Sequence, residues 1–430
     1  MSTWRIPEVP AAILFVLVVH VAAFADSDRR PLTLPDALEL ALTHSPELEA
    51  LDWGVRADEA RMVQAGEMPN PELDLRLYRL GIPRRSTPDD TERMRVIVSQ
   101  VFELGGKRRK RVALAGAEHR LAGLDYQARQ AFVAAEVARR FAAVLGAQRR
   151  VETWADTTEF LERTHKRVMG LVEAGTLGRL ASHRTARQIA IGRMELQRAE
   201  SVLAAARFAL VATWGGRSPS FTEAVGDFER IDALPGIETV IEMAQESPGA
   251  RRWNAEAERS KARLALAKSE RVPDITYGVG MRWESSFDQR DYLVDLEFDL
   301  PIFDRKRGEI LAARRRMAQA EARHRAADAI NSARISEAYF AVVEGRSRSM
   351  AFATEIVPAS RAAFDAFLGV FDSQAENLEE LLDSRQDLTR AESDHASALE
   401  DYHRALATLE ALVGRSLSGV EDSRAEGSGR

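Results

Sequence analysis

Two segments of this sequence carry opposite charge, and both lie inside long helical patterns. From Arg167 to Arg187, four arginines outweigh Glu173, which gives 4 − 1 = +3. From Asp365 to Arg385, six carboxylates outweigh one arginine, which gives 1 − 6 = −5. Such segments attract each other when a fold brings them together, although each exposed ion pair contributes only about 0–1 kcal/mol to the stability of that fold. Rings of carboxylates also favour cations. These segments are therefore the first candidate sites.

A third set of charged residues alternates with apolar residues, as on one face of a strand. Its acidic members are Asp295, Glu297 and Asp299, and its basic members are Arg76, Arg95 and Arg282. Opposite charges on adjacent strands form cross-strand pairs. We favour ion pairs that satisfy these charges over a substrate site, which remains the alternative.

The chemistry of enzymes is missing from the sequence. Leu104-Gly-Gly-Lys-Arg-Arg109 lacks the frame of a phosphate loop, and neither His-Glu-x-x-His nor Gly-x-Ser-x-Gly occurs. Cysteine is absent, and no two histidines have the i, i+3 or i+4 spacing that places two metal ligands on one helix face. The sequence therefore predicts no enzyme, no cofactor and no dedicated metal site. The scattered histidines are His44, His119, His165, His183, His324, His395 and His403.

Charge distribution and the N-terminus restrict the partners and the compartment. The 60 basic and 66 acidic residues are interspersed along the chain, which makes nucleic acid an improbable partner. Arg5 precedes an apolar run that ends in Ala23-Phe24-Ala25, the pattern of a signal peptide over residues 1–25. The run is short for a membrane-spanning helix of about 20 residues, so an uncleaved anchor is the weaker alternative.

Long helical patterns enclose two pairs of strand patterns, and the whole unit occurs twice. Strands are predicted near residues 72–80, 93–102, 274–283 and 291–300, and helical hairpins over 105–214 and 305–413. Ser45-Pro46 matches Ser247-Pro248, so we predict a first repeat over 26–216, a linker over 217–236 and a second repeat over 237–417. Residues 418–430 are predicted to be a disordered tail.

Finer predictions concern particular helices. The pattern from Leu34 predicts one helix of about 30 residues, and Pro358 predicts a kink. Leu104 is aligned with Phe303 at the two strand-to-helix transitions. Apolar spacing predicts one buried seam through Ala322, Ala326, Ala329, Ala333, Ser336, Phe340 and Val343, and another through Leu388, Ala391, His395, Ala398, Tyr402, Ala405, Leu409 and Leu412.

Four strands of membrane-spanning length present a physical problem, because an open sheet edge is not tolerated in lipid. Three copies would supply twelve strands, with apolar faces toward lipid and polar faces toward a lumen. We therefore predict a mainly α chain with a small membrane β part, in which a twelve-stranded barrel continues into a periplasmic helical tunnel.

The order of motifs across both repeats resembles TolC-type outer-membrane efflux proteins. These motifs are Leu34-Pro-Asp-Ala-Leu38, Gln100-Val-Phe-Glu-Leu-Gly-Gly-Lys107, Leu300-Pro-Ile-Phe-Asp-Arg-Lys-Arg-Gly308 and Leu412-Val-Gly414. The Phe-Glu-Leu-Gly-Gly-Lys-Arg version is most similar to the CzcC-like heavy-metal branch. The resemblance implies a homotrimer in the bacterial outer membrane that works with a periplasmic adaptor and an inner-membrane pump of the resistance-nodulation-division type. Drug or protein export is the alternative, and a poreless periplasmic adaptor is a weaker one.

This resemblance implies roles for the charged and apolar residues at the hairpin tips. A periplasmic gate would comprise Asp372, Glu376, Glu379, Asp383, Arg179, Arg184 and Arg187, and solvated helix ends without a gating role are the alternative. Core packing is the favoured interpretation, and adaptor docking the alternative, for the tip residues Gly175, Leu177, Leu180, Leu378, Leu381 and Leu382. The lumen of the barrel would carry the six strand residues named above. Gly105, Gly106, Pro301 and Gly308 would mark the junction of barrel and tunnel.

Overall fold

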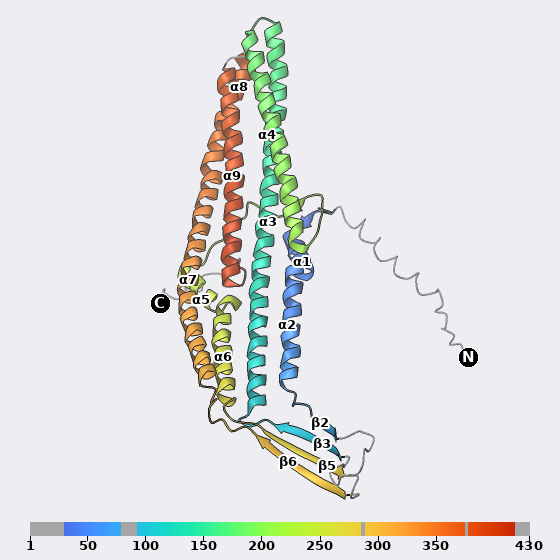
Figure 1. Ribbon diagram of the computed structural model, residues 1–430. Helices are drawn as coiled ribbons and strands as arrows, with labels where there is room; N and C mark the ends of the chain where they lie inside the picture. Colours follow the sequence, from blue (N-terminus) through green and yellow to red (C-terminus); the bar gives the residue numbers. More distant parts are fainter. Residues whose placement is uncertain (1–29, 79–92, 285–288, 375–376, 418–430) are drawn as a thin grey trace, which may run out of the picture. The chain divides into compact units, whose positions relative to one another are not determined.

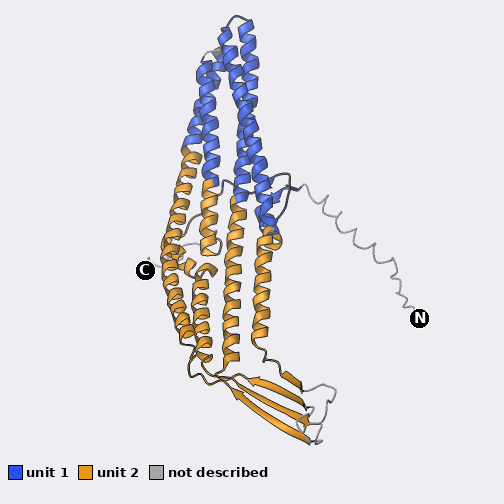
Figure 2. Cartoon of the chain, in the orientation of Figure 1, with its two compact units in different colours: residues 1–40, 140–229, 356–400 blue, residues 41–139, 230–355, 401–430 orange. Residues whose placement is uncertain are grey.

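The computed structural model describes residues 30–78, 93–284, 289–374 and 377–417. The predicted signal peptide, the tail and Glu376 lie outside these ranges. The chain forms two compact units, shown in Figure 2. Unit 1 contains residues 1–40, 140–229 and 356–400, and unit 2 contains residues 41–139, 230–355 and 401–430. Each unit is described by itself.

Helices make up most of the described chain, and four long strands form one sheet (Figure 1). The first half contains β1 (Leu32–Thr33), α1 (Leu34–His44), α2 (Pro46–Ala65), β2 (Glu72–Tyr78), β3 (Arg93–Phe102), α3 (Lys107–Glu173), α4 (Arg179–Val211) and β4 (Ala224–Val225). The second half contains α5 (Ile237–Gln245), α6 (Pro248–Ser269), β5 (Ile275–Glu284), β6 (Gln289–Phe298), α7 (Arg307–Ala351), α8 (Val357–Gln374) and α9 (Leu378–Val413). The prediction of a mainly helical chain with four long strands is confirmed.

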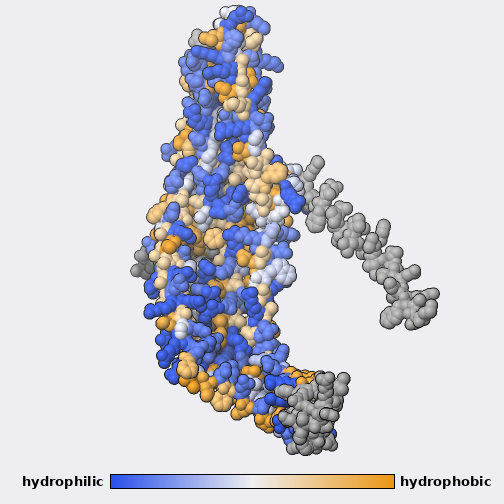
Figure 3. All heavy atoms as spheres, in the orientation of Figure 1, coloured by the Kyte–Doolittle hydropathy of each residue, from blue (hydrophilic) through white to orange (hydrophobic). Residues whose placement is uncertain are grey.

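The four long strands are antiparallel in the order β2-β3-β5-β6. Val98 pairs with Val279, which pairs with Val294, so these side chains share one apolar face. Tyr292 on the same face of β6 is 85% exposed. In Figure 3, hydrophobic side chains gather around the start of the sheet, where unit 2 passes from helix to strand. The alternation predicted from the sequence therefore separates one apolar from one polar face.

The polar face contains a tightly packed site that the sequence did not reveal. Ile97 pairs with Gly280 and is 3% exposed. A Cβ atom on Gly280 would lie 2.3 Å from the Val96 carbonyl oxygen and 2.5 Å from Ile97 Cγ1. Strands β3 and β5 can approach this closely only because Gly280 has no side chain.

The two strand-to-helix junctions differ in length. Residues 103–106 connect β3 to α3, whereas residues 299–306 connect β6 to α7. Gly106 has φ +69°, and Lys306, the residue before α7, has φ 53°. Lys306 therefore corresponds to Gly106, so the alignment of Leu104 with Phe303 is wrong by one residue. Because the second junction holds four more residues, no single offset aligns both the strand ends and the helix starts.

The junction residues named from the sequence have different structural roles. Gly105 also has φ +69°, and a Cβ atom there would lie 3.0 Å from Val272 Cβ. Glycine is therefore favoured at this position. Gly308 lies inside α7 with open space around it, so its conformation does not require glycine. Pro301 lies in the segment between β6 and α7, where it removes no hydrogen bond of the sheet.

The prediction of one 30-residue helix from Leu34 is wrong. The chain forms α1 and α2, which are separated by Ser45, with Pro46 as the first residue of α2. Proline is common at the first position of a helix, because the N–H group that it lacks would have no acceptor within the helix. The same break separates α5 from α6 at Ser247 and Pro248. The two repeats therefore share this feature.

The seam predicted for α9 is confirmed in large part, and the seam predicted for α7 is wrong. Leu388, Ala398, Tyr402 and Leu409 of α9 are buried. In α7, by contrast, Phe340 is 60% exposed, and the buried residues include Ala338, Val342 and Gly345. A Cβ atom on Gly345 would lie 3.0 Å from Tyr402 Cα, so α7 presents its small residues to α9. An alanine-rich helix has several faces with small residues, and the face that allows the closest approach of the two backbones is the one that becomes buried.

The irregularity predicted at Pro358 takes the form of a π-helical turn. Residues Phe352–Ile356 are π-helical, and α8 begins at Val357. Pro358 cannot donate the backbone hydrogen bond that would close a regular α-helical turn onto Thr354. A π-helical turn is one way to accommodate such an interruption. None of the described helices is long and apolar enough to cross a membrane.

Candidate functional site

An apolar cluster joins α3, α8 and α9 in unit 1. Its buried members are Val168 of α3, Phe364 and Phe371 of α8, and Leu381 and Leu388 of α9. Leu177 and Leu378 pack against it, and Leu382 belongs to a second cluster with Leu161 and Ile189. Leu180 is different, because its side chain is 64% exposed. Four of the five tip leucines thus lie in or against the core, and Leu180 faces solvent.

The turn between α3 and α4 is closed by its own backbone. Gly175 has φ +74°, its N–H group donates to the Val172 carbonyl at 3.1 Å, and that of Thr176 donates to Leu171 at 2.9 Å. A glycine in this conformation is a common helix end. The turn therefore sets where α4 begins and where its basic residues lie.

Two ion pairs connect the basic and acidic segments within unit 1. Arg167 of α3 pairs with the Asp372 carboxylate of α8, donates to the Asp372 carbonyl at 2.8 Å and lies 5.2 Å from the Phe371 ring centre. Arg184 Nη1 of α4 lies 2.6 Å from Glu379 Oε2 of α9. The two hairpins of one chain thus carry complementary charges at their tips.

Three other predicted gate residues remain available for other contacts. Arg179, Arg187 and Asp383 are exposed, and within the described ranges none of their side chains makes an ion pair or hydrogen bond with a protein group. The structure thus brings together only some of the predicted gate residues. Arg167 was counted in the charge of its segment but not proposed as a gate residue.

Arg385 is a further residue that sequence reasoning used only as a charge. Its guanidinium carbon lies 5.5 Å from the Phe160 ring centre and 5.3 Å from that of Phe364, and Nη2 donates to Thr157 Oγ1 at 2.9 Å. Burial lowers the pKa of this guanidinium. The spacing of Leu381, Arg385 and Leu388 places all three on one helix face and was the signal available in the sequence.

On the polar face of the sheet in unit 2, each of the three predicted arginines has a carboxylate partner. Arg95 Nη2 lies 2.7 Å from Asp295 Oδ2. Arg76 pairs with Asp74 at 3.0 Å, and Arg282 pairs with Asp291 at 2.8 Å. Among the described residues, Glu297 and Asp299 have no such partner, and both line a groove on this face. The arrangement leaves unneutralised negative charge beside the second junction.

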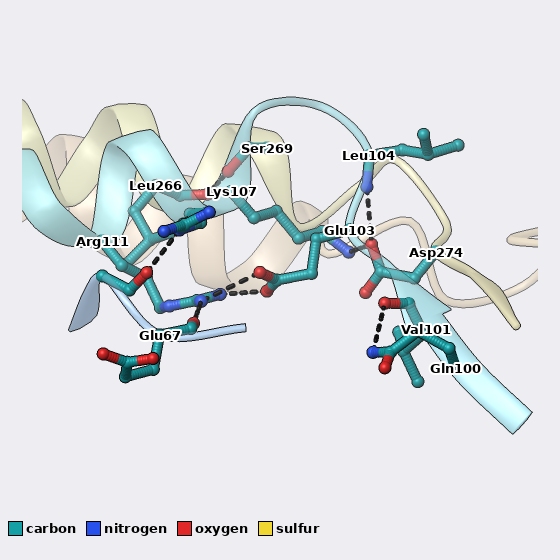
Figure 4. Close-up of polar contacts among 12 residues, drawn as sticks. Glu67, Gln100, Val101, Glu103, Leu104, Lys107, Arg111, Leu266, Ser269 and Asp274 are labelled. Atoms are coloured by element: carbon teal, nitrogen blue, oxygen red, sulfur yellow. Dashed lines mark hydrogen bonds and ion pairs between the residues drawn. The ribbon is translucent and has the colours of Figure 1, made fainter. Parts of the chain in front are cut away.

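A polar network links the two repeats at the first junction (Figure 4). The Asp274 carboxylate lies 2.7 Å from Lys107 Nζ and accepts the Leu104 N–H group at 3.0 Å. Arg111 pairs with Glu103, which raises the pKa of Arg111. Asp274 begins the second repeat's hairpin, whereas Lys107 begins α3 of the first. The sequence flagged the glycines here but missed Asp274, because its partners lie far away in the chain.

Neither the hairpin tips of unit 1 nor the polar face of the sheet in unit 2 is arranged as a metal centre. No three His, Asp or Glu side chains within the described ranges are placed to hold a metal ion together. Both sites consist of paired and unpaired charges on exposed surfaces, which can attract, repel or guide ions without fixing them.

A family model described as outer membrane efflux protein matches residues 37–216 and 242–415. The chain is 27% identical to the cobalt-zinc-cadmium resistance protein CzcC of Cupriavidus metallidurans, over 92% of this chain and 93% of that protein. It is 28% identical to the nickel and cobalt resistance protein CnrC of the same organism, over 74% of each.

Solved structures share the fold at low sequence identity. The CusC structure has a TM-score of 0.75 at 14% identity and covers 89% of this chain and 92% of its own. A membrane protein from Pseudomonas aeruginosa has a TM-score of 0.74 at 18% identity, with coverage of 90% and 91%. The long helices and the four strands described above are therefore features of a shared architecture.

Proposed function

Because the chain belongs to the outer membrane efflux protein family, it is an efflux channel of the outer membrane and not an enzyme, and we propose that it exports divalent heavy-metal cations. The observation that carries this proposal is the similarity to CzcC, which extends over nearly the whole of both chains. The unpaired carboxylates on the polar face of the sheet agree with a path for cations.

The proposed assembly is a homotrimer. The apolar face of the sheet is exposed in one protomer, and β2 and β6 are its edge strands. Edges of this kind are not tolerated in lipid. Pairing of β2 with β6 of a neighbouring copy would close a barrel of twelve strands, with Asp295, Glu297 and Asp299 toward the lumen. The trimer would receive its substrate from a resistance-nodulation-division pump through a periplasmic adaptor.

The proposed docking residue for the adaptor is Leu180. It is the exposed leucine among the five considered at the hairpin tips, while the other four stabilise the tip core. An isolated exposed leucine is common on protein surfaces. Its place in the first turn of α4, beside Arg179, makes it accessible to a partner that approaches the tips.

The proposed gate operates through ion pairs between helices. Arg167–Asp372 and Arg184–Glu379 would hold the two hairpins of each protomer together, and Arg179, Arg187 and Asp383 would pair with neighbouring protomers. Each exposed ion pair contributes about 0–1 kcal/mol to the stability of the closed state, so several pairs must act together. The binding energy of a partner would be enough to open them.

The gate proposal predicts leakage when its acidic members are neutralised. In planar bilayers, the double variant Asp372→Asn with Glu379→Gln is expected to raise the closed-state conductance several-fold. Asp387→Asn with Glu159→Gln removes the same charge from exposed positions of α9 and α3 and serves as the control. An unchanged closed-state conductance and cation selectivity in the gate variant would refute the assignment.

The proposed substrate class predicts a selective growth defect. A strain that lacks this protein is expected to lose growth on zinc, cobalt, cadmium, copper or nickel at concentrations that the parent tolerates, with little change on common antibiotics. Plasmid complementation provides the control. Sensitivity to antibiotics alone would indicate drug export through the same channel, and sensitivity to none of these compounds would contradict the metal substrate.

A further inference from the structure

A groove between α6 and α7 in unit 2 gathers arginines without enough carboxylates. Its floor contains the small buried side chains of Ser260, Ala313 and Ala320. Its walls carry two arginines from each helix and one carboxylate: Arg259, Arg263, Arg316, Arg323 and Glu256. Guanidinium groups on one concave surface repel each other unless anions lie between them. The groove therefore carries a charge imbalance that its own residues do not resolve.

Carboxylates of α3 pair with arginines of α6 on another face of that helix. Arg252 Nε lies 2.6 Å from Asp125 Oδ1 of α3, and Arg263 Nη2 lies 3.1 Å from Glu118 Oε1 of α3. Helix α6 thus meets α3 with complementary charges, and both of its groove arginines have carboxylate partners, so the uncompensated charge of the groove lies on α7. The imbalance belongs to the α6–α7 groove and is not a general property of α6.

Two guanidinium groups of the groove have no protein partner within the part of the chain that the structure describes. Arg259 pairs with Glu256 one turn away at 2.5 Å, and Arg263 is held by Glu118. Among the residues that the structure describes, no ion pair or side-chain hydrogen bond engages Arg316 or Arg323. These two lie seven positions apart on α7, so they point to the same side two turns apart.

We propose that this groove binds a phosphate group, either free inorganic phosphate or the phosphate ester of a lipid headgroup. Guanidinium groups donate N–H bonds in a planar fork that matches two phosphate oxygens. Arg316 lies nine residues into α7, about 14 Å along the helix from its start beside the sheet. The membrane surface and the surrounding solution are the two sources of such a group. A site of this charge repels metal cations.

Binding measurements on the full-length trimer in neutral detergent test the proposal. One arm titrates inorganic phosphate by calorimetry, and the other measures binding of phosphatidylglycerol against an uncharged diglyceride in mixed micelles. The double variant Arg316→Gln with Arg323→Gln is expected to weaken binding about tenfold or more. Arg314→Gln with Arg315→Gln removes equal charge from exposed residues of the same helix outside the groove and is expected to change binding less than about twofold.

A second readout does not depend on calorimetry. Phosphate is expected to raise the thermal midpoint of the wild-type trimer and of the Arg314/Arg315 control, but not that of the groove variant. Saturable binding of free phosphate identifies the solution source, and binding confined to the lipid arm identifies the headgroup. Absence of saturable binding in both arms, or equal weakening in the control and groove variants, would overturn the proposal.

Discussion

Replacing Gly280 by valine is expected to disrupt the four-stranded sheet and greatly reduce the yield of assembled channel. The added Cβ atom would lie 2.3 Å from the Val96 carbonyl oxygen, which belongs to the backbone and cannot rotate away. Strand β5 would have to move away from β3 and lose ladder hydrogen bonds. Overpacking of this kind lowers the stability of the fold by about 1–3 kcal/mol, and the lost hydrogen bonds add to that cost. The measurements are the fraction of heat-modifiable trimer and the urea midpoint.

Two alanine variants calibrate this prediction. At Gly308, an added methyl group meets nothing within 4 Å, and alanine is the better helix former, so Gly308→Ala is expected to retain full stability. At Gly278, the nearest atom is the side-chain Ile97 Cγ2 at 3.1 Å, so Gly278→Ala is expected to cost less than Gly280→Val. Normal trimer yield from Gly280→Val would show that β3 and β5 do not approach as described.

The second large effect is expected from Leu381→Ala at the tip core. Leu381 has no exposed surface and packs in the cluster that includes Val168 and Phe371. Truncating a fully buried leucine removes its transfer free energy and leaves a cavity, at a cost of about 2–5 kcal/mol. The expected result is a lower denaturant midpoint for the helical part, together with faster proteolysis near the hairpin tips.

Leu180→Ala provides the matched control, since it makes the same substitution at an exposed position of the same region. It is expected to change stability by less than about 0.5 kcal/mol, but to lower the yield of crosslinks to the adaptor. If Leu180→Ala destabilises the tips as strongly as Leu381→Ala, the assignment of core and surface is wrong. If it leaves the crosslinks unchanged, Leu180 is not the docking residue.

The four strands could be predicted because alternation of side chains is a local property. Tyr277, Val279 and Met281 alternate with small or polar residues whatever lies beside the strand. The order of the strands could not be predicted in this way. Pairing of Ile97 with Gly280 depends on where two distant segments meet, so the close approach at Gly280 had no signature in either segment alone.

The α7 seam illustrates a different limit. Apolar spacing indicated Phe340 and Val343, but alanine and glycine on another face of α7 allow closer approach to Tyr402. Helical periodicity identifies possible faces and cannot rank them when small residues occur on several. Packing density decides, because a glycine allows two helix backbones to approach closely and leave no void between them.

The charged segments were visible in the sequence, but their pairing was not. Net charge indicated that residues 167–187 and 365–385 would attract each other. Arg167 and Arg184 have partners in unit 1, whereas Arg179 and Arg187 have none among the described residues, and the choice depends on helix rotation and on where Gly175 ends α3.

By itself, the sequence determined the type of most elements, the repeated plan, the absence of enzymatic motifs and the family resemblance. These properties follow from residue type and from spacing over a few turns or strand positions. The tertiary structure alone decided that Asp274 joins the two repeats, that Gly280 must lack a side chain and that arginines of α6 and α7 line one groove. Steric contact and ion pairing depend on distances of a few ångströms between residues far apart in the chain, and only the folded arrangement sets those distances.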